Sequence, residues 1–251
     1  MTLTQGEAIA IIIPEYCSPT TCADVSGILF KDDRYGEYEN VPGVHKWGLN
    51  TYEGLSSADR RNRYFADVVP TIRSLRSTFA PRLSPIDKIR LELQESWPGG
   101  ANLEFIDDER LFVGQARVFE KGHGAEPHQD FLPWETAGLS DSVRARAFEL
   151  AGQLTVNIYL QVPEVGGEVD LWTTGYDYQE YQSHKVASDH YALRRADIPP
   201  PAATIKPVAG MLLMFHATRP HAVRPSPYDH RVALSCFVGI RDRNQPLTYW
   251  S

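Results

Sequence analysis

The chain has 251 residues, of which 42% are hydrophobic and 23% charged, and these proportions are ordinary for a soluble globular protein. The formal net charge is -7 and the lysines and arginines are scattered, so the composition indicates no basic surface for nucleic acid. No apolar run approaches the length of a membrane-spanning helix, and we therefore expect no membrane segment.

The N-terminal segment holds a short apolar stretch, Ala8–Pro14, without a basic leader before it or a small-residue cleavage site after it. We therefore expect no signal peptide and a cytoplasmic location. The cysteines at positions 17, 22 and 236 are few and odd in number, so they predict no disulfide framework. Cys17 and Cys22 also lack the further soft ligands that a zinc site requires.

Residues 1–101 are predicted to be mainly helix and loop. The segment Ser56–Phe79 has apolar residues at close to helical spacing, and Pro70 within it is expected to break or kink the helix. Ser84–Glu95 begins with a capping serine followed by proline at the first helical position, which predicts a second helix.

From about Asn102 onward, short apolar runs alternate with turn residues. The runs that predict strands are Leu111–Phe119, Leu154–Val162, Glu168–Trp172, Gly210–Phe215 and Arg231–Ile240. Helices followed by closely spaced strands favour an α+β fold, with a small β-barrel or a double-sheet jelly roll over residues 102–251 and helical support from residues 1–101. No strong linker divides the sequence, so we expect one domain spanning residues 1–251.

The sharpest motif is a His-x-Asp triplet, His128-Gln129-Asp130, followed much later by Pro220-His221. On an extended strand, alternate side chains share one face, so His128 and Asp130 are expected to point the same way. A distant histidine would complete a facial set of two imidazoles and one carboxylate. Such a set leaves open positions for a chelating co-substrate and O2, and suits non-haem Fe(II) oxygenases. His216 is the rival to His221 as the distal ligand.

A basic residue and a hydroxyl follow the second histidine, in Arg231-Val-Ala-Leu-Ser235. Residues four apart on a strand face the same side, so Arg231 and Ser235 can bind one anion together. The planar guanidinium matches a carboxylate with two parallel hydrogen bonds, and the hydroxyl adds a further donor.

The order of these motifs resembles the 2-oxoglutarate/Fe(II) dioxygenase superfamily, and especially its prolyl-hydroxylase-like branch. The likeness runs from about Leu111 to Ile240, roughly half of the chain. The chain also has a weaker resemblance to freestanding enzymes that hydroxylate or chlorinate amino acids and alkaloids. The residues that carry it are Trp97-Pro98, Gln153–Gly167 and Tyr249–Ser251. Halogenases of that group have glycine where this chain has Asp130, so the resemblance implies a hydroxylating member.

The resemblance implies specific roles for the residues of these motifs. His128, Asp130 and His221 would bind Fe(II), and His221 is preferred to His216 because its spacing to Arg231 fits the family. Arg231 and Ser235 would then hold the distal carboxylate of 2-oxoglutarate.

Two residues of one predicted strand are further candidates for co-substrate binding. Tyr159 stands where related enzymes place a co-substrate tyrosine. Asn157 alternates with it and is a polar residue in an apolar run, which calls for a partner. The alternative for Tyr159 is a core tyrosine bonded to the backbone.

Other polar and aromatic residues are candidates for substrate contact, each with a structural alternative. Arg117 interrupts an apolar strand and needs an anion, which would be the substrate, the co-substrate or a structural carboxylate. Phe131 and Trp134 would wall the pocket unless they are plain core. Arg73, with Arg76, would clamp a substrate carboxylate or lie on a solvated helix face. The remaining candidates are His123, in a Gly-His-Gly loop, and His216.

The resemblance implies Fe(II), 2-oxoglutarate and O2 as the reactants, with succinate and CO2 released and an unactivated C–H bond hydroxylated. A small-molecule substrate is expected, either an amino acid or a natural-product intermediate, on a monomer or homodimer. Desaturation or cyclisation would use the same ligands. Two segments, Tyr176–Pro201 and Asp32–Leu55, are predicted to act as lids.

Two other classes of function compete with this interpretation. A cupin-type metalloenzyme would use three histidines and a glutamate without a co-substrate, and the pair Arg231 and Ser235 argues against it. A non-catalytic metal-binding jelly-roll protein is the second alternative, and the intact ligand set argues against that one.

Overall fold

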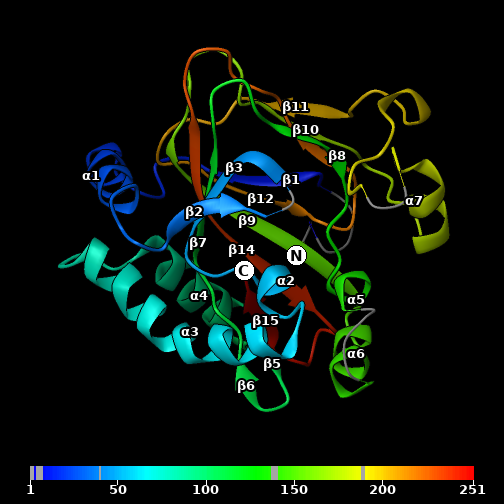
Figure 1. The fold of residues 1–251 in the computed structure, drawn as a ribbon, viewed down its shortest axis with the longest axis horizontal. Helices are drawn as coiled ribbons and strands as arrows, with labels where there is room; N and C mark the ends of the chain where they lie inside the picture. Colours follow the sequence, from blue (N-terminus) through cyan, green and yellow to red (C-terminus); the bar gives the residue numbers. More distant parts are fainter. Residues whose placement is uncertain (1–2, 4–7, 40, 137–140, 188–189) are drawn as a thin grey trace.

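The computed structural model describes residues 3, 8–39, 41–136, 141–187 and 190–251. Its core is formed by two mainly antiparallel sheets that face each other, with helices packed on the outer side of the larger sheet (Figure 1). These features confirm the predicted α+β fold with a two-sheet core.

The larger sheet contains strands from both halves of the sequence. Its members are β1 (Ala10–Ile13), β2 (Tyr35–Tyr38), β3 (Val41–Trp47), β4 (Ala101–Leu103), β7 (Gln115–Phe119), β9 (Gly152–Gln161), β12 (Leu212–His216), β14 (Arg231–Ile240) and β15 (Leu247–Trp250). The main strand order is β1-β12-β9-β14-β7-β3-β2, and β15 and β4 extend the sheet from β14. Strands β9 and β14 therefore lie at its centre.

The smaller sheet contains β8 (Ala125–His128), β10 (Val169–Leu171), β11 (Ala203–Ile205) and β13 (His221–Val223), in the order β11-β10-β13-β8. Apolar side chains from β10 pack against side chains from β9, β12 and β14, and this contact fills one end of the space between the sheets. A separate short hairpin is formed by β5 (Phe105–Ile106) and β6 (Glu109–Arg110).

The helices are α1 (Pro19–Leu29), α2 (Thr51–Gly54), α3 (Ala58–Phe79), α4 (Pro85–Ser96), α5 (Leu132–Glu135), α6 (Asp141–Phe148) and α7 (Tyr178–His184), with a 3-10 turn at Arg195–Asp197. Helices α1, α3 and α4 bury their apolar faces against the outer side of the larger sheet. Serine side chains cap all three N-termini, because Ser18, Ser57 and Ser84 each accept a hydrogen bond from a backbone N–H three residues on.

Helix α3 continues through Pro70, so a break there is wrong, and a kink at this residue stays a prediction. A proline inside a helix removes one backbone hydrogen bond and crowds the preceding turn, at a cost of about 3 kcal/mol. Here the residues on either side, Val68, Thr71 and Leu75, are buried against the core. This burial outweighs the local cost and keeps the helix in one piece.

The predicted strands of the second half are confirmed within a few residues at each end, although the first part of Leu111–Phe119 is irregular before β7 begins. The N-terminal region contributes more strand than expected, because β1, β2 and β3 all join the larger sheet. Strand β2 contains a glycine, and β3 contains a proline and a glycine, so neither shows a clear strand pattern; β3 is held by its pairing with β7, and β2 by its pairing with β3.

Within the described ranges, no helix is both long enough and apolar enough to span a membrane.

Candidate metal centre

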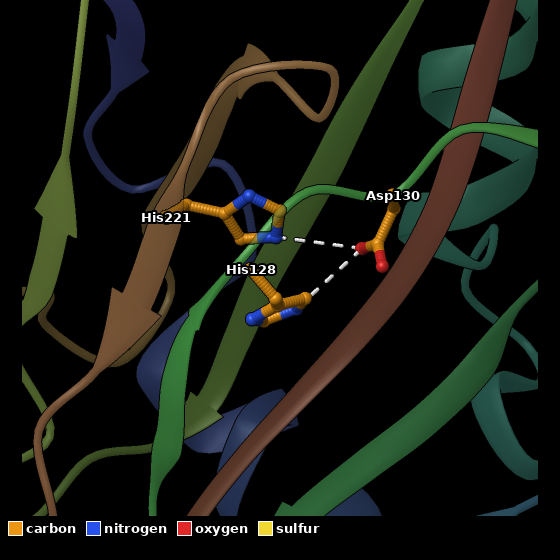
Figure 2. Close-up of side chains that lie close together, drawn as sticks. All are labelled: His128, Asp130 and His221. Carbon is orange, nitrogen blue, oxygen red and sulfur yellow. Dashed lines mark ion pairs between the residues drawn. The ribbon is translucent and has the colours of Figure 1, made fainter. Parts of the chain in front are cut away.

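The three predicted ligands meet where the two strands β8 and β13 pair. His128, the last residue of β8, stands directly opposite His221, the first residue of β13. Asp130 lies just beyond the end of β8, and its backbone N–H donates to the carbonyl of Ala217 at 2.8 Å. The strand therefore ends between His128 and Asp130, and the turn that follows directs the carboxylate toward both imidazoles (Figure 2).

The ligand atoms lie at distances that suit one metal ion. The Nε2 of His128 is 3.7 Å from Oδ2 of Asp130, and the Nε2 of His221 is 3.4 Å from the same oxygen (Figure 2). One ligand atom from each of the three residues lies within 4.8 Å of the others. Nitrogen and oxygen ligands about 2.1 Å from a common ion are separated by distances of this order.

Both imidazoles are held in the tautomer that a metal requires. The Nδ1 of His128 is 2.7 Å from the carbonyl oxygen of Glu126, and the Nδ1 of His221 is 3.0 Å from that of Arg219. A carbonyl only accepts, so each Nδ1 carries a proton, and in the neutral imidazole the lone pair is therefore on Nε2. Hydrogen bonds of this kind orient metal-binding histidines in other proteins.

The electrostatics of the cluster favour a neutral imidazole beside a carboxylate. Burial and the neighbouring His221 lower the pKa of His128 to about 4. Burial raises the pKa of Asp130, but His128, His221 and Arg117 outweigh it and hold that pKa well below its usual range. At neutral pH, His128 and Asp130 are therefore already in their metal-binding protonation states.

This low pKa predicts a pH dependence of stability in the metal-free protein. Between about pH 6.5 and pH 4, the unfolded chain protonates His128 whereas the folded chain does not, so the free energy of unfolding should fall as the pH falls. The decrease due to this histidine should reach about 1–3 kcal/mol at the acid end. Urea denaturation at pH 7 and pH 5 measures it. A His128→Gln variant with an equally steep pH dependence would refute this origin.

The three residues open into a cavity of about 690 Å³ between the two sheets. The other predicted residues that line it are Arg117, Asn157, Arg231, Phe131 and Trp134. The two segments predicted to be lids also border it, at Tyr38 to Glu53 and at Tyr178 to Tyr191. Residues 40, 188 and 189 of those segments lie outside the described residues, and movement of either segment stays a prediction.

Arg231 begins β14 and is buried within this cavity, with 4% of its surface exposed. Its Nη2 donates to the Tyr159 hydroxyl at 3.1 Å, and its guanidinium lies over the rings of Phe119 and Tyr159. The Nε has no hydrogen-bond partner among the described residues. Because a buried guanidinium needs an anion, the surroundings of Arg231 fit the carboxylate of a bound molecule.

The remaining co-substrate candidates lie on neighbouring central strands. Ser235 is the cross-strand partner of Asn157, and Tyr159 is that of Ala233. The hydroxyl of Ser235 donates to the carbonyl of Gln115 at 3.4 Å, and the Asn157 amide donates to the Thr155 hydroxyl at 3.4 Å. These contacts are long, so both side chains retain hydrogen-bonding capacity for a ligand.

Three candidates for substrate contact lie outside the cavity. His123 packs on Gly43, where a Cβ atom would meet the imidazole ring, and its Nδ1 lies 3.1 Å from the carbonyl of Lys121. Arg73 belongs to α3, on the opposite face of the larger sheet. The Nε2 of His216 bonds the carbonyl of Leu3 at 2.9 Å, whereas the preceding Phe215 faces the cavity.

Gln129 is a residue of the site that the sequence did not identify. Its side-chain amide donates to the carbonyl of Tyr176 at 3.1 Å and accepts from the N–H of the same residue at 2.8 Å. Its own backbone N–H donates to the Tyr181 hydroxyl at 3.4 Å. The residue between two ligands thus holds the segment that leads into α7. The only signal for Gln129 in the sequence was its position between His128 and Asp130. Its partner is the backbone of Tyr176, which residue identity does not reveal.

Tyr191 is a second such residue. Its ring meets the imidazole of His128 edge-on, with ring centroids 5.3 Å apart. Two residues after it, Leu193 donates its backbone N–H to the carbonyl of Pro127 at 2.8 Å. The insertion after β10 therefore lies along the strand that carries the first ligand, a contact that sequence spacing does not reveal.

Comparison with known proteins gives independent information. Residues 114–239, which are half of the chain, match a family model described as the 2OG-Fe(II) oxygenase superfamily. The structure is similar to that of an N-substituted L-amino acid dioxygenase from Burkholderia ambifaria AMMD, with a TM-score of 0.59 and 17% identity over 100% of this chain and 89% of the other. A structure of such a dioxygenase from this organism in complex with alpha-KG has the same TM-score and coverage at 16% identity. Proteins with curated descriptions gave no match.

Proposed function

The protein belongs to the 2OG-Fe(II) oxygenase superfamily, and from this premise we propose that it hydroxylates an unactivated C–H bond of a small molecule, an amino acid or a natural-product intermediate. The observation that carries the proposal is the convergence of two imidazoles and one carboxylate on the cavity that also contains buried Arg231. The similar solved structures show the double-stranded β-helix fold, and the site supplies the argument for function.

His128, Asp130 and His221 would hold Fe(II) and leave three positions open. With Fe(II) and 2-oxoglutarate bound, such a site supplies oxidative decarboxylation, in which one atom of O2 enters the substrate as hydroxyl, the other enters succinate, and CO2 leaves. Asp130 would occupy one position of the metal, which supports hydroxylation over halogenation because no position would be left for a halide in its place.

The co-substrate would be oriented by the sheet residues behind the metal. The guanidinium of Arg231 and the hydroxyl of Tyr159 are joined at 3.1 Å and would bind the distal carboxylate of 2-oxoglutarate together. Ser235 follows Arg231 on the same face of β14 and adds a hydroxyl farther along it. The buried position of these donors strengthens each hydrogen bond, because little water competes for the anion.

The walls of the cavity would exclude water from the reacting atoms. Phe131 and Trp134 form one side, with ring centroids 5.6 Å apart, and Trp134 also meets Tyr181 of the insertion at 5.2 Å. A closed aromatic wall limits hydrolysis and side reactions of reactive intermediates.

A cavity of about 690 Å³ is in the range of small-molecule sites, which supports a small substrate over a folded protein. The similar dioxygenase from Burkholderia ambifaria is named for N-substituted L-amino acids, which adds support for a substrate of the amino-acid class. The described cysteines are buried and free, which supports a reducing location such as the cytoplasm. A monomer or homodimer remains our expectation for the assembly.

The direct test is turnover of 2-oxoglutarate by the purified full chain with Fe(II) and a library of small molecules. We expect succinate to form in step with a product that has gained one oxygen atom, both measured by mass spectrometry. A product that has lost two hydrogens would indicate desaturation or cyclisation instead. Binding of metal without any succinate formation from 2-oxoglutarate would contradict the proposal and favour a non-catalytic binding protein.

A further inference from the structure

We propose that Cys17 and Cys22 are a site of reversible oxidation, at which hydrogen peroxide converts the two thiols into a disulfide and thereby weakens the binding of 2-oxoglutarate. Formation of the disulfide is independent of the proposed function, whereas its effect on the co-substrate rests on that function. The position of the two cysteines at a helix start, their common attachment to the larger sheet, and the link from that point to Arg231 support the proposal.

The two cysteines flank the first turn of α1. Ser18 is the N-cap of this helix, so Cys17 is the residue before the cap and Cys22 is the fourth helical residue. Side chains at these two positions often pack against each other where a chain enters a helix. The thiols of Cys17 and Cys22 accordingly share a hydrogen bond, and both are free in the structure. The pair is therefore placed for a crosslink that leaves the helix intact.

Both cysteines are also attached to one point of the larger sheet. The backbone N–H of Cys17 donates to the carbonyl of Gly210 at 3.0 Å, and the thiol of Cys22 donates to the carbonyl of Tyr159 at 3.7 Å. The two acceptors are linked in turn, because the N–H of Gly210 donates to the Tyr159 carbonyl at 2.8 Å. A Cβ atom at position 210 would lie 2.3 Å from the carbonyl oxygen of Cys17, so only glycine allows this close approach.

Cys17 has the properties of the thiol that reacts first. It reaches the surface with 8% of its area exposed, whereas Cys22 is fully buried. The hydrogen bond with Cys22 lowers the pKa of Cys17, burial raises it, and the positive charges of Lys88 and Arg82 lower it further. The thiolate is the form that peroxides oxidise, and a lowered pKa increases its fraction at neutral pH. Cys22 then supplies the second thiol.

The oxidation needs no reactant besides the peroxide. The Cys17 thiolate attacks one oxygen of hydrogen peroxide, the O–O bond breaks, and a sulfenic acid and one water form. The sulfur of Cys22 then attacks the sulfur of Cys17, so that an S–S bond replaces the S–O bond and a second water leaves. The two thiol hydrogens end in the two waters, and the two sulfur atoms together give two electrons to the peroxide.

The disulfide should be easy to reduce again. Four residues separate the two cysteines, so the crosslink closes a short loop and restricts the unfolded chain only a little. A crosslink of this kind suits a reducing compartment, where disulfides are usually transient and often redox-sensing.

The crosslink would act on the co-substrate site through Tyr159. Its hydroxyl accepts from Nη2 of Arg231 at 3.1 Å, and its ring lies 4.8 Å from the guanidinium. A disulfide sulfur has no hydrogen to donate, so the Tyr159 carbonyl loses the donor from Cys22. The ladder between β9 and β14 is irregular between Val232 and Ala233, where Ala233 pairs with Tyr159, so a regular ladder does not hold the backbone there. A small tilt of Tyr159 would misalign the two groups proposed to bind the distal carboxylate.

The first measurement detects the disulfide itself. The metal-free full chain, with its three thiols reduced, is treated with a small excess of hydrogen peroxide and followed by intact mass and peptide mapping. We expect the loss of two hydrogen atoms, a peptide in which Cys17 is joined to Cys22, and one remaining thiol, that of Cys236. Dithiothreitol should restore the starting mass, which separates a disulfide from a sulfinic acid or an oxidised methionine.

The second measurement is the affinity for 2-oxoglutarate. After removal of peroxide, the reduced and oxidised proteins are loaded with Fe(II) without oxygen, and 2-oxoglutarate is titrated into each in a calorimeter. We expect the Kd of the oxidised protein to be about threefold to tenfold higher, which is the size of effect that follows from weakening one hydrogen bond. Reduction of the disulfide before loading should restore the original Kd.

Variants assign both effects to the pair. Cys17→Ala and Cys22→Ser should each abolish the crosslink and the response of the Kd to peroxide. Cys22→Ser keeps a donor for the Tyr159 carbonyl and should have the Kd of the reduced parent, whereas Cys22→Ala lacks it and should have a raised Kd without peroxide. Cys236 provides the matched control: burial raises its pKa to about 12, so Cys236→Ala should form the crosslink and respond to peroxide as the parent does.

The contrary results are distinct from one another. Two free thiols after peroxide treatment, or oxidation of Cys17 to a sulfinic acid without a crosslink, overturn the proposal. Equal Kd values for the crosslinked and reduced proteins also overturn it, because the disulfide would then have no effect on the site. A reduced, Fe(II)-loaded protein that binds no 2-oxoglutarate would contradict the proposed function instead, and the mass measurement would still decide whether the disulfide forms.

Discussion

Replacing Asp130 with glycine is expected to abolish hydroxylation. The carboxylate lies 3.4 Å from one imidazole nitrogen and 3.7 Å from the other, so its removal leaves a metal with two protein ligands. Loss of a residue that only supports a ligand typically costs 10–100-fold in metal affinity or activity, and loss of a ligand should cost at least about a hundredfold. Product formation and Fe(II) affinity, measured together, test this expectation.

A matched control is available in the same chain. Asp108 is exposed and has a φ of 66°, a conformation that glycine adopts without strain. Asp108→Gly should therefore keep both metal affinity and turnover. Normal product yield from Asp130→Gly would show that Asp130 is not a required ligand, and would remove the main support for the proposed function.

Replacing Arg231 with methionine should prevent the protein from using 2-oxoglutarate at ordinary concentrations. Truncation of one partner of a buried, hydrogen-bonded charge pair costs about 2–5 kcal/mol, which corresponds to a rise of at least about thirtyfold in the KM for the co-substrate. The metal ligands are untouched, so Fe(II) affinity should be unchanged. Steady-state kinetics over a wide range of 2-oxoglutarate concentrations measures the effect.

The melting temperature of the ligand-free protein distinguishes this role from a structural one. Arg231 is 4% exposed and its Nε lacks a partner among the described residues, so methionine removes a buried charge that is only partly compensated. The gain from removing this charge is offset by the lost hydrogen bond to the buried Tyr159 hydroxyl, so we expect the melting temperature to change little. A ligand-free Arg231→Met protein that melts well below the parent, with an unchanged KM, would indicate a structural arginine. Arg63→Met, on the exposed side of α3, provides the control for loss of one positive charge.

The sequence predicted the parts of the fold that depend on local pattern. Strand β14 begins and ends where the apolar run Arg231–Ile240 does, and α4 begins after its capping Ser84. The chemistry of the site was also predictable, because His128 and Asp130 are close in the chain and His221 has a recognisable relation to Arg231.

The parts that were missed depend on tertiary pairing. Strand β3 contains Pro42 and Gly43 and has no strand pattern of its own, and its pairing with β7 on one side and β2 on the other makes it a strand. The backbone carbonyls of Glu126 and Arg219 fix the orientation of the two imidazoles. Any residue type can supply a backbone carbonyl, so the sequence does not reveal these acceptors. His123 and Arg73 lie outside the cavity because of tertiary packing, which the sequence pattern does not reveal either.

The placement of Gln129 links the shape of the cavity to the geometry of the ligands. Its backbone joins His128 to Asp130, and its side chain pairs with both backbone groups of Tyr176 in the manner of a short strand. Any outward shift of the segment at Tyr176 must either break this pair or turn the peptide units on which the two ligands are mounted. A molecule that contacts Tyr178, two residues after Tyr176, would therefore act on the metal ligands through the consecutive residues His128, Gln129 and Asp130, without touching the ion.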